Sequence, residues 1–99
     1  MSEQSVYKTT IGRIQQMEEV YDRLWKAVRE EPRFLCEDPL LKEMYQTLQD
    51  YYESGQWLQD YEADESGELP PDLKRGVLSQ DGVYNLLDHV SYLKESTKG

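Results

Sequence analysis

The sequence has 99 residues, of which 20 are acidic and 11 are basic, so a chain the size of one domain carries a formal charge of −9. This charge counts against direct binding to nucleic acid or to an anionic membrane, and an aromatic content of 11% counts against a disordered chain. The single cysteine excludes an intrachain disulfide, no apolar run is long enough to span a membrane, and the first ten residues, MSEQSVYKTT, lack the apolar stretch of a signal peptide, so we expect a cytoplasmic protein.

The first predicted helix spans residues near 9–31 and follows a flexible lead-in at residues 1–8. Thr9 or Thr10 can act as its N-cap, because a threonine oxygen can accept an amide hydrogen of the first turn. Apolar residues then recur at spacings of three and four, which is typical of a helix with one buried face. These residues are Ile14, Met17, Tyr21, Leu24 and Val28. Pro32 ends the helix, because proline disfavours helical geometry in the residue before it.

The second predicted helix spans residues near 39–54. Asp38 can accept the amide hydrogens of its first turn, and Pro39 at the first helical position has no amide hydrogen to lose. The three-and-four spacing returns in Leu41, Met44, Tyr45, Leu48, Tyr51 and Tyr52. Gly55 predicts the end of this helix, because glycine adopts the left-handed cap geometry without steric cost.

An insert separates this helix from the last one. Trp57 and Tyr61 predict one or two further helical turns, which end where the chain becomes densely acidic. After Pro70 and Pro71, residues 72–75 are predicted as one helical turn closed by glycine at position 76. Ser79 is the predicted N-cap of the third main helix, near residues 80–95, and residues 96–99 form a frayed tail.

These elements predict an all-α fold. No strand pattern competes with the helical spacings, and no internal repeat is visible. We expect a single domain at residues 9–95, built as a small bundle of three main helices with a short-helical or irregular insert between the second and the third.

Part of the chain resembles a known family. The resemblance is carried by YYESGQWLQDYEADE at residues 51–65, by Leu69-Pro70, and by DLKRGVLSQDGVYNLL at residues 72–87. These blocks are similar to a small bacterial family of helical proteins catalogued as a domain of unknown function. The resemblance implies a short helical fold and a bacterial or phage origin, and it implies no catalytic residue.

The side chains that could support catalysis are few. His89 is the one histidine and Cys36 the one cysteine, and neither has a neighbour in sequence that marks a catalytic motif. We interpret His89 as a surface or packing histidine and Cys36 as a small buried apolar group. The expectation is therefore a protein that is not an enzyme and has no catalytic residue.

A partial calcium-binding pattern lies in the acidic stretch. Glu62, Asp64 and Ser66 stand at the first, third and fifth positions of such a loop, and Gly67 stands at the sixth. Leu73 occupies the twelfth position, where the loop needs a bidentate glutamate. A solvated acidic face is therefore favoured over a weak cation site, and we expect no metal and no cofactor.

Two groups of residues remain as candidate binding sites. No basic residue lies between Lys42 and Lys74, which predicts a strongly negative surface there. The candidate partner surface consists of Asp60, Tyr61, Glu62, Asp64, Glu65 and Glu68. Lys74, Arg75 and Ser79 form a candidate anion contact, because two bases precede the amide hydrogens of a helix start. Alternatively, the two bases neutralise acids nearby.

The aromatic residues Tyr52, Trp57, Tyr61 and Tyr84 are dense for so short a segment. Core packing is the favoured interpretation, with an interface as the alternative. The whole insert has the same two interpretations: residues 51–87 carry the function, or the insert folds onto the bundle as an extension of the core. In the second case the buried residues would be Trp57, Leu58, Tyr61, Leu69, Leu73 and Leu78.

Three functions fit this sequence. The first is a non-enzymatic protein-interaction or regulatory module whose insert contacts another protein. The second is an acidic mimic of nucleic acid, such as a phage inhibitor that occupies the basic groove of a DNA- or RNA-binding protein. The third is a small-anion or ligand-binding domain. The expected partner is a protein in the first two cases, with no direct contact to nucleic acid or membrane.

Overall fold

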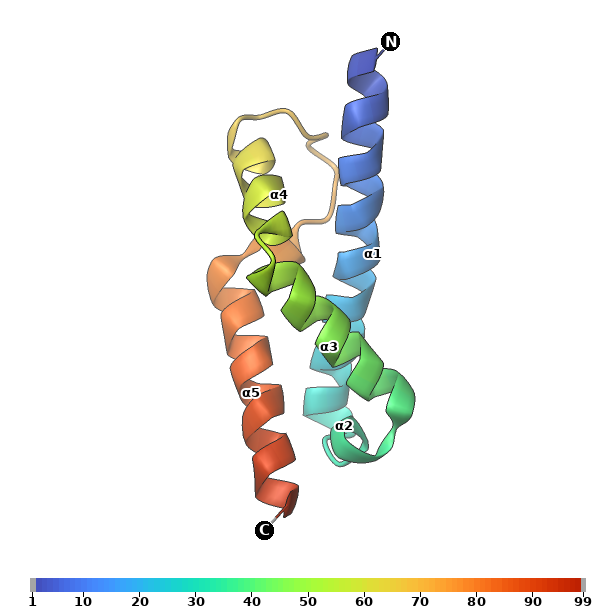
Figure 1. Cartoon of the computed structure of the whole chain (residues 1–99), viewed down its shortest axis with the longest axis vertical. Helices are drawn as coiled ribbons and strands as arrows, with labels where there is room; N and C mark the ends of the chain where they lie inside the picture. Colours follow the sequence, from blue (N-terminus) through green and yellow to red (C-terminus); the bar gives the residue numbers. More distant parts are fainter. Residues whose placement is uncertain (1, 99) are drawn as a thin grey trace.

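The computed structural model describes the backbone of residues 2–98 and the side chains of residues 8–93. Five α-helices and one 3-10 helix make up this part of the chain, which contains no strand (Figure 1). They are α1 (Ser2–Glu30), α2 (Phe34–Glu37), α3 (Pro39–Glu53), α4 (Gln56–Glu65), η1 (Gly76–Leu78) and α5 (Gln80–Lys98). The predicted all-α class is confirmed, but the three-helix count is wrong, because both connections contain helices of their own.

Helix α1 runs from the top of the molecule down to the level of α2, and α5 extends below it (Figure 1). It begins at Ser2, so the predicted start at Thr9 or Thr10 is wrong and the predicted lead-in forms the first turns of the helix from Ser2 onward. The physical reason is that residues 2–8 contain no proline or glycine, and a helix continues where nothing interrupts its hydrogen bonds. The helix ends at Glu30, just before Pro32, as predicted.

The link between α1 and α3 forms the short helix α2, which buries Leu35 against the bundle. Asp38 then caps α3, since its Oδ1 accepts a 2.9 Å hydrogen bond from the amide of Leu40. Gly55 follows the end of α3 with φ of 91°, a left-handed conformation that favours glycine. Both predicted ends of this helix are thereby confirmed.

The lower part of the molecule in Figure 1 is an apolar core between α1, α2, α3 and α5. Many of its side chains are at most 1% exposed. They include Leu24, Ala27, Leu35, Leu41, Leu48, Leu86 and Val90. The helical spacing in the sequence predicted Leu24, Leu41 and Leu48, because residues three and four apart share one face of a helix.

The upper part pairs the first half of α1 with α4 and with the connection at residues 66–79 (Figure 1). Residues 72–75 do not form the predicted helical turn; the helical turn comes later, as η1. Ser79 caps α5 as predicted, since its Oγ accepts a 3.2 Å hydrogen bond from the amide of Gly82. Helix α5 then runs to Lys98, beyond its predicted end near residue 95.

The insert folds onto the bundle and extends its core. Trp57, Leu69, Leu73 and Leu78 are each less than 9% exposed, and Val77 is fully buried. Four of the six residues that the core interpretation places inside the molecule are thus buried, and this packing is compatible with a functional outer surface on the insert. The other two residues that this interpretation places in the core are not buried: Leu58 is 51% exposed and Tyr61 is half-buried.

Candidate functional site

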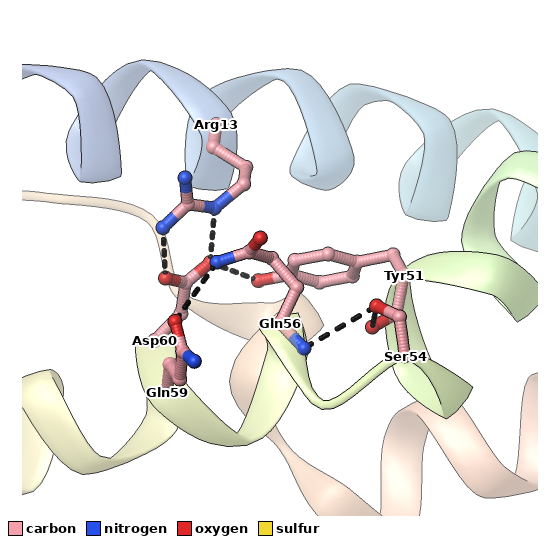
Figure 2. Close-up of polar contacts among 6 residues, drawn as sticks. All are labelled: Arg13, Tyr51, Ser54, Gln56, Gln59 and Asp60. Carbon is pink, nitrogen blue, oxygen red and sulfur yellow. Dashed lines mark hydrogen bonds and ion pairs between the residues drawn. The ribbon is translucent and has the colours of Figure 1, made fainter.

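A buried carboxylate fixes α4 to its neighbours (Figure 2). Asp60 is 1% exposed, and its two oxygens accept hydrogen bonds from Arg13 of α1, at 2.9 Å from Nε and 2.5 Å from Nη2. The Tyr51 hydroxyl of α3 donates a third bond to Oδ2, at 2.6 Å. An arginine fork on a carboxylate gives both strength and fixed geometry. One side chain therefore joins three helices.

This network favours the protonated forms of Tyr51 and Arg13. Burial raises the pKa of the Tyr51 phenol, and the neighbouring Asp60 carboxylate raises it further. The hydrogen bond to Asp60 also raises the pKa of Arg13 above its ordinary value. Tyr51 therefore stays protonated and Arg13 stays charged over the physiological range. With its carboxylate enclosed and occupied by three donors, the network acts as a structural tie.

The predicted partner surface was wrong about Asp60. On α4, Asp60 lies three residues after Trp57, so both side chains fall on the buried face of the helix. A charge can be buried only with a partner, and Arg13 of α1 is that partner for Asp60. Because the two residues are 47 positions apart, no local pattern in the sequence signals the pair.

The rest of the predicted surface divides into two groups. Glu62, Glu65 and Glu68 are exposed, whereas Asp64 is partly buried and lies 2.8 Å from Nε of Arg75 as an ion pair. Tyr61 stacks on Trp57, with ring centroids 5.1 Å apart.

Four residues of α4 share one side of the helix, because they follow the helical spacing of three, four and seven. They are Leu58, Tyr61, Glu62 and Glu65, and within this group a hydrogen bond to Glu65 raises the pKa of Tyr61. We call these four residues the outer face of α4.

Trp57 is the anchor beneath this face. Its indole is 5% exposed and donates a 2.8 Å hydrogen bond to the carbonyl of Val77. Tyr52 packs edge-on against the same ring, with centroids 5.2 Å apart. The core interpretation is confirmed for Trp57 and is wrong for Tyr84, which is 60% exposed on α5.

The predicted anion contact is not supported by the geometry. Arg75 donates 2.7 Å and 3.3 Å hydrogen bonds to the carbonyls of Pro70 and Pro71, in addition to its ion pair with Asp64. Ser79 is engaged in capping α5. Lys74 is exposed and forms no ion pair within the described part of the chain, and carboxylates line the groove beside it. The alternative, in which the bases neutralise acids, is correct for Arg75.

A groove of about 540 Å³ lies between α1 and residues 70–74. On the α1 side the lining residues recur at helical spacing, and on the other side they come from the chain after α4. The lining residues are Ile11, Gln15, Glu18, Glu19, Asp22, Pro70, Asp72, Leu73 and Lys74. Sequence reasoning missed this groove, because its two sides are separated in the chain by the whole of α2, α3 and α4.

One carboxylate holds the two sides of the groove together. Glu18 is 9% exposed, and its Oε1 accepts a 2.8 Å hydrogen bond from the amide of Val77. Gly76 leaves room for this carboxylate, because a Cβ there would lie 3.0 Å from Oε2 of Glu18 and the carboxylate would have to shift slightly. The backbone of η1 is thus fastened to α1 by a side chain.

The residues with catalytic or metal-binding chemistry remain apart. No group of three or more His, Cys, Asp or Glu side chains that could hold a metal occurs among the described residues. His89 is exposed beside the Trp25 ring, at 6.0 Å between centroids, and Cys36 Sγ lies 3.8 Å from the carbonyl of Leu93. Within the described residues, no helix is both long and apolar enough to cross a membrane.

Comparison with known proteins identifies a family and no individual relative. No curated protein and no solved structure matches the chain. One family model matches residues 14–97, which include most of α1 and all later elements. The match is thus wider than the resemblance at residues 51–87 that the sequence suggested. The chain belongs to the family described as Domain of unknown function (DUF4298).

Proposed function

We propose that this protein is a non-enzymatic protein-interaction module and that the outer face of α4 contacts its partner. The observation that carries the proposal is the composition of that face. It combines an apolar side chain that is 51% exposed, Leu58, with a tyrosine and two exposed glutamates. Protein interfaces are typically built in this way, with an apolar or aromatic centre and a charged rim.

Charge indicates the kind of partner. No basic residue occurs between Lys42 and Lys74, so nothing in α4 offsets Glu62 and Glu65. A partner surface with lysine or arginine around an apolar patch complements this face. Such complementarity accelerates association and excludes acidic competitors more than it raises affinity.

The contacts that hold α4 in position support the same proposal. The Arg13–Asp60–Tyr51 network and the bond from Trp57 to Val77 fix the helix from its inner side. A helix fixed in this way loses little further conformational freedom when its outer face is covered. The stacked ring of Tyr61 is likewise held before any partner arrives.

The test begins with capture of the partner from cells of the source organism, followed by measurement of its affinity. The double substitution Leu58→Ala with Glu62→Lys removes the exposed apolar group and reverses one charge on the outer face of α4. The matched control, Leu40→Ala with Glu43→Lys, makes the same changes on α3, where Leu40 is 57% exposed and Glu43 is exposed.

We expect the α4 variant to bind at least about tenfold more weakly, which corresponds to about 1.4 kcal/mol, and the control to change affinity by less than about twofold. Circular dichroism should show both variants folded. Equal affinity of the two variants would rule out the outer face of α4 as the contact.

A further inference from the structure

An exposed aromatic ring and three exposed bases lie close together in the chain, where α1 turns into α2 in the lower half of the molecule (Figure 1). Phe34, the first residue of α2, is 37% exposed, and the guanidinium carbon of Arg33 lies 5.6 Å from the centre of its ring. Lys26 and Arg29 are exposed three positions apart near the end of α1. We call Lys26, Arg29, Arg33 and Phe34 the basic corner.

The bases of this corner are available to a partner. Within the described part of the chain, none of the three forms an ion pair. Residues 23–42 contain five bases and four acids, but Glu31 already pairs with Arg23 and Asp38 caps α3, so unpaired bases are in excess. A guanidinium that stacks on a ring also keeps the donors at its edge free for carboxylates.

The outer face of α4 has the opposite charge. Residues 43–73 contain nine acids and no base, and on this face Glu62 and Glu65 are exposed. The same face carries apolar surface, since Leu58 is 51% exposed. Carboxylates fit the planar donor fork of a guanidinium, and Leu58 can pack on the ring of Phe34. One chain therefore carries both halves of a complementary contact.

We infer that the outer face of α4 binds the basic corner of a second copy of this chain. The inference rests on the proposed function, because it names the partner of the same face. The two surfaces lie in the upper and lower halves of a molecule 53 Å long, so one copy cannot pair them within itself and copies join head to tail (Figure 1). Such a contact repeats from copy to copy and builds a ring or a filament. Pairing of two α4 faces is disfavoured, because it would bring carboxylates together.

The expected association is reversible. The formal charge of −9 on each copy opposes it, but screening limits the reach of this repulsion to about 8 Å at physiological ionic strength. Opposite charges in direct contact lie within that distance and still attract one another. Each exposed ion pair contributes little, so we expect a small interface with a dissociation constant between about 10 µM and 1 mM.

Sedimentation velocity of the intact protein, at concentrations from about 10 µM to 1 mM, measures this association. Glu62→Lys with Glu65→Lys reverses the charge of the outer face of α4. Arg29→Glu with Arg33→Glu reverses the charge of the basic corner. Each double variant brings like charges together and should associate at least about tenfold more weakly than the unsubstituted protein.

A control and a rescue separate this pairing from a general effect of charge. Glu19→Lys with Asp22→Lys, exposed at the same spacing on α1, changes the net charge as the α4 variant does and should stay within about threefold of the unsubstituted protein. The quadruple variant, with both surfaces reversed, has complementary surfaces again and should recover association to within about threefold. An equimolar mixture of the two double variants should associate likewise, since each offers the other a complementary surface.

A protein that sediments as a monomer up to about 1 mM would overturn the inference. Association that either double variant retains, or that neither the mixture nor the quadruple variant recovers while circular dichroism shows them folded, would overturn it as well. These results leave the proposed function intact, because another protein can still bind the outer face of α4. The proposed function fails separately, if the captured partner binds the α4 and α3 variants equally.

Discussion

The two halves of the molecule are held together by different means. In the lower half, α1, α2, α3 and α5 pack through side chains such as Leu24, Leu48 and Leu86, all fully buried. In the upper half, buried polar contacts hold the chain in addition to buried apolar side chains. The clearest are the carboxylate of Asp60 between three helices and the carboxylate of Glu18 on the amide of Val77.

The difference follows from backbone chemistry. A helix satisfies its own amide and carbonyl groups, so helices in the lower half need from their neighbours little more than apolar contact. Residues 66–75 form no regular helix, and their polar backbone groups need other partners when they are covered. Arg75 supplies these partners at Pro70 and Pro71, and Trp57 does so for the next segment at Val77. Side chains thus supply part of the backbone pairing that a helix would supply itself.

The largest expected effect comes from removing the central carboxylate. Asp60→Ala leaves the guanidinium of Arg13 and the hydroxyl of Tyr51 without their buried partner, which should cost about 3–5 kcal/mol of the free energy of unfolding. Denaturation by urea measures this loss. The control Glu62→Ala, an exposed acid two positions away, should change stability by less than about 0.5 kcal/mol. Equal effects of the two substitutions would show that the network contributes nothing specific.

A smaller loss of stability is expected for Arg75→Ala, and almost none for the adjacent Lys74→Ala. Arg75→Ala removes two hydrogen bonds to backbone carbonyls and the ion pair with Asp64, and should cost about 1–2 kcal/mol. Lys74→Ala should stay within about 0.5 kcal/mol, because Lys74 is exposed. The sequence assigned both bases to one candidate anion contact at the surface, where substitutions usually change stability by less than about 0.5 kcal/mol. Thermal unfolding of the two variants measures the difference. A clearly lower melting temperature for Arg75→Ala than for Lys74→Ala supports the structural role of Arg75, whereas similar melting temperatures favour the surface site assigned from the sequence.

The sequence predicted the features that depend on neighbours in the chain. The caps by Asp38 and Ser79 and the left-handed Gly55 follow from residues within a few positions of one another. The family resemblance was also correct, on residues inside the matched region. Helix starts were less accurate, because nothing in residues 2–8 forbids a helix and nothing there marks its beginning.

The candidate sites depended on contacts between distant residues, and these could not be read from local patterns. Arg13 and Asp60 are 47 positions apart, and Glu18 and Val77 are 59 apart. An acidic residue looks the same in sequence whether a distant arginine buries it or water surrounds it. Asp60 was therefore grouped with Glu62 and Glu65, and the groove along α1 was missed.

Amide hydrogen exchange on the Asp60→Ala variant tests the central claim most directly. If the Asp60 network fixes the upper half, residues 56–79 should open as a unit, with exchange at least about 100-fold faster than in the unsubstituted protein. Amides of α3 between Leu41 and Leu48 are expected to exchange through global unfolding, so the substitution accelerates them as well, but they should stay slower than residues 56–79 in the variant. Equal exchange rates in the two regions of the variant, or no change at residues 56–79, would contradict the account.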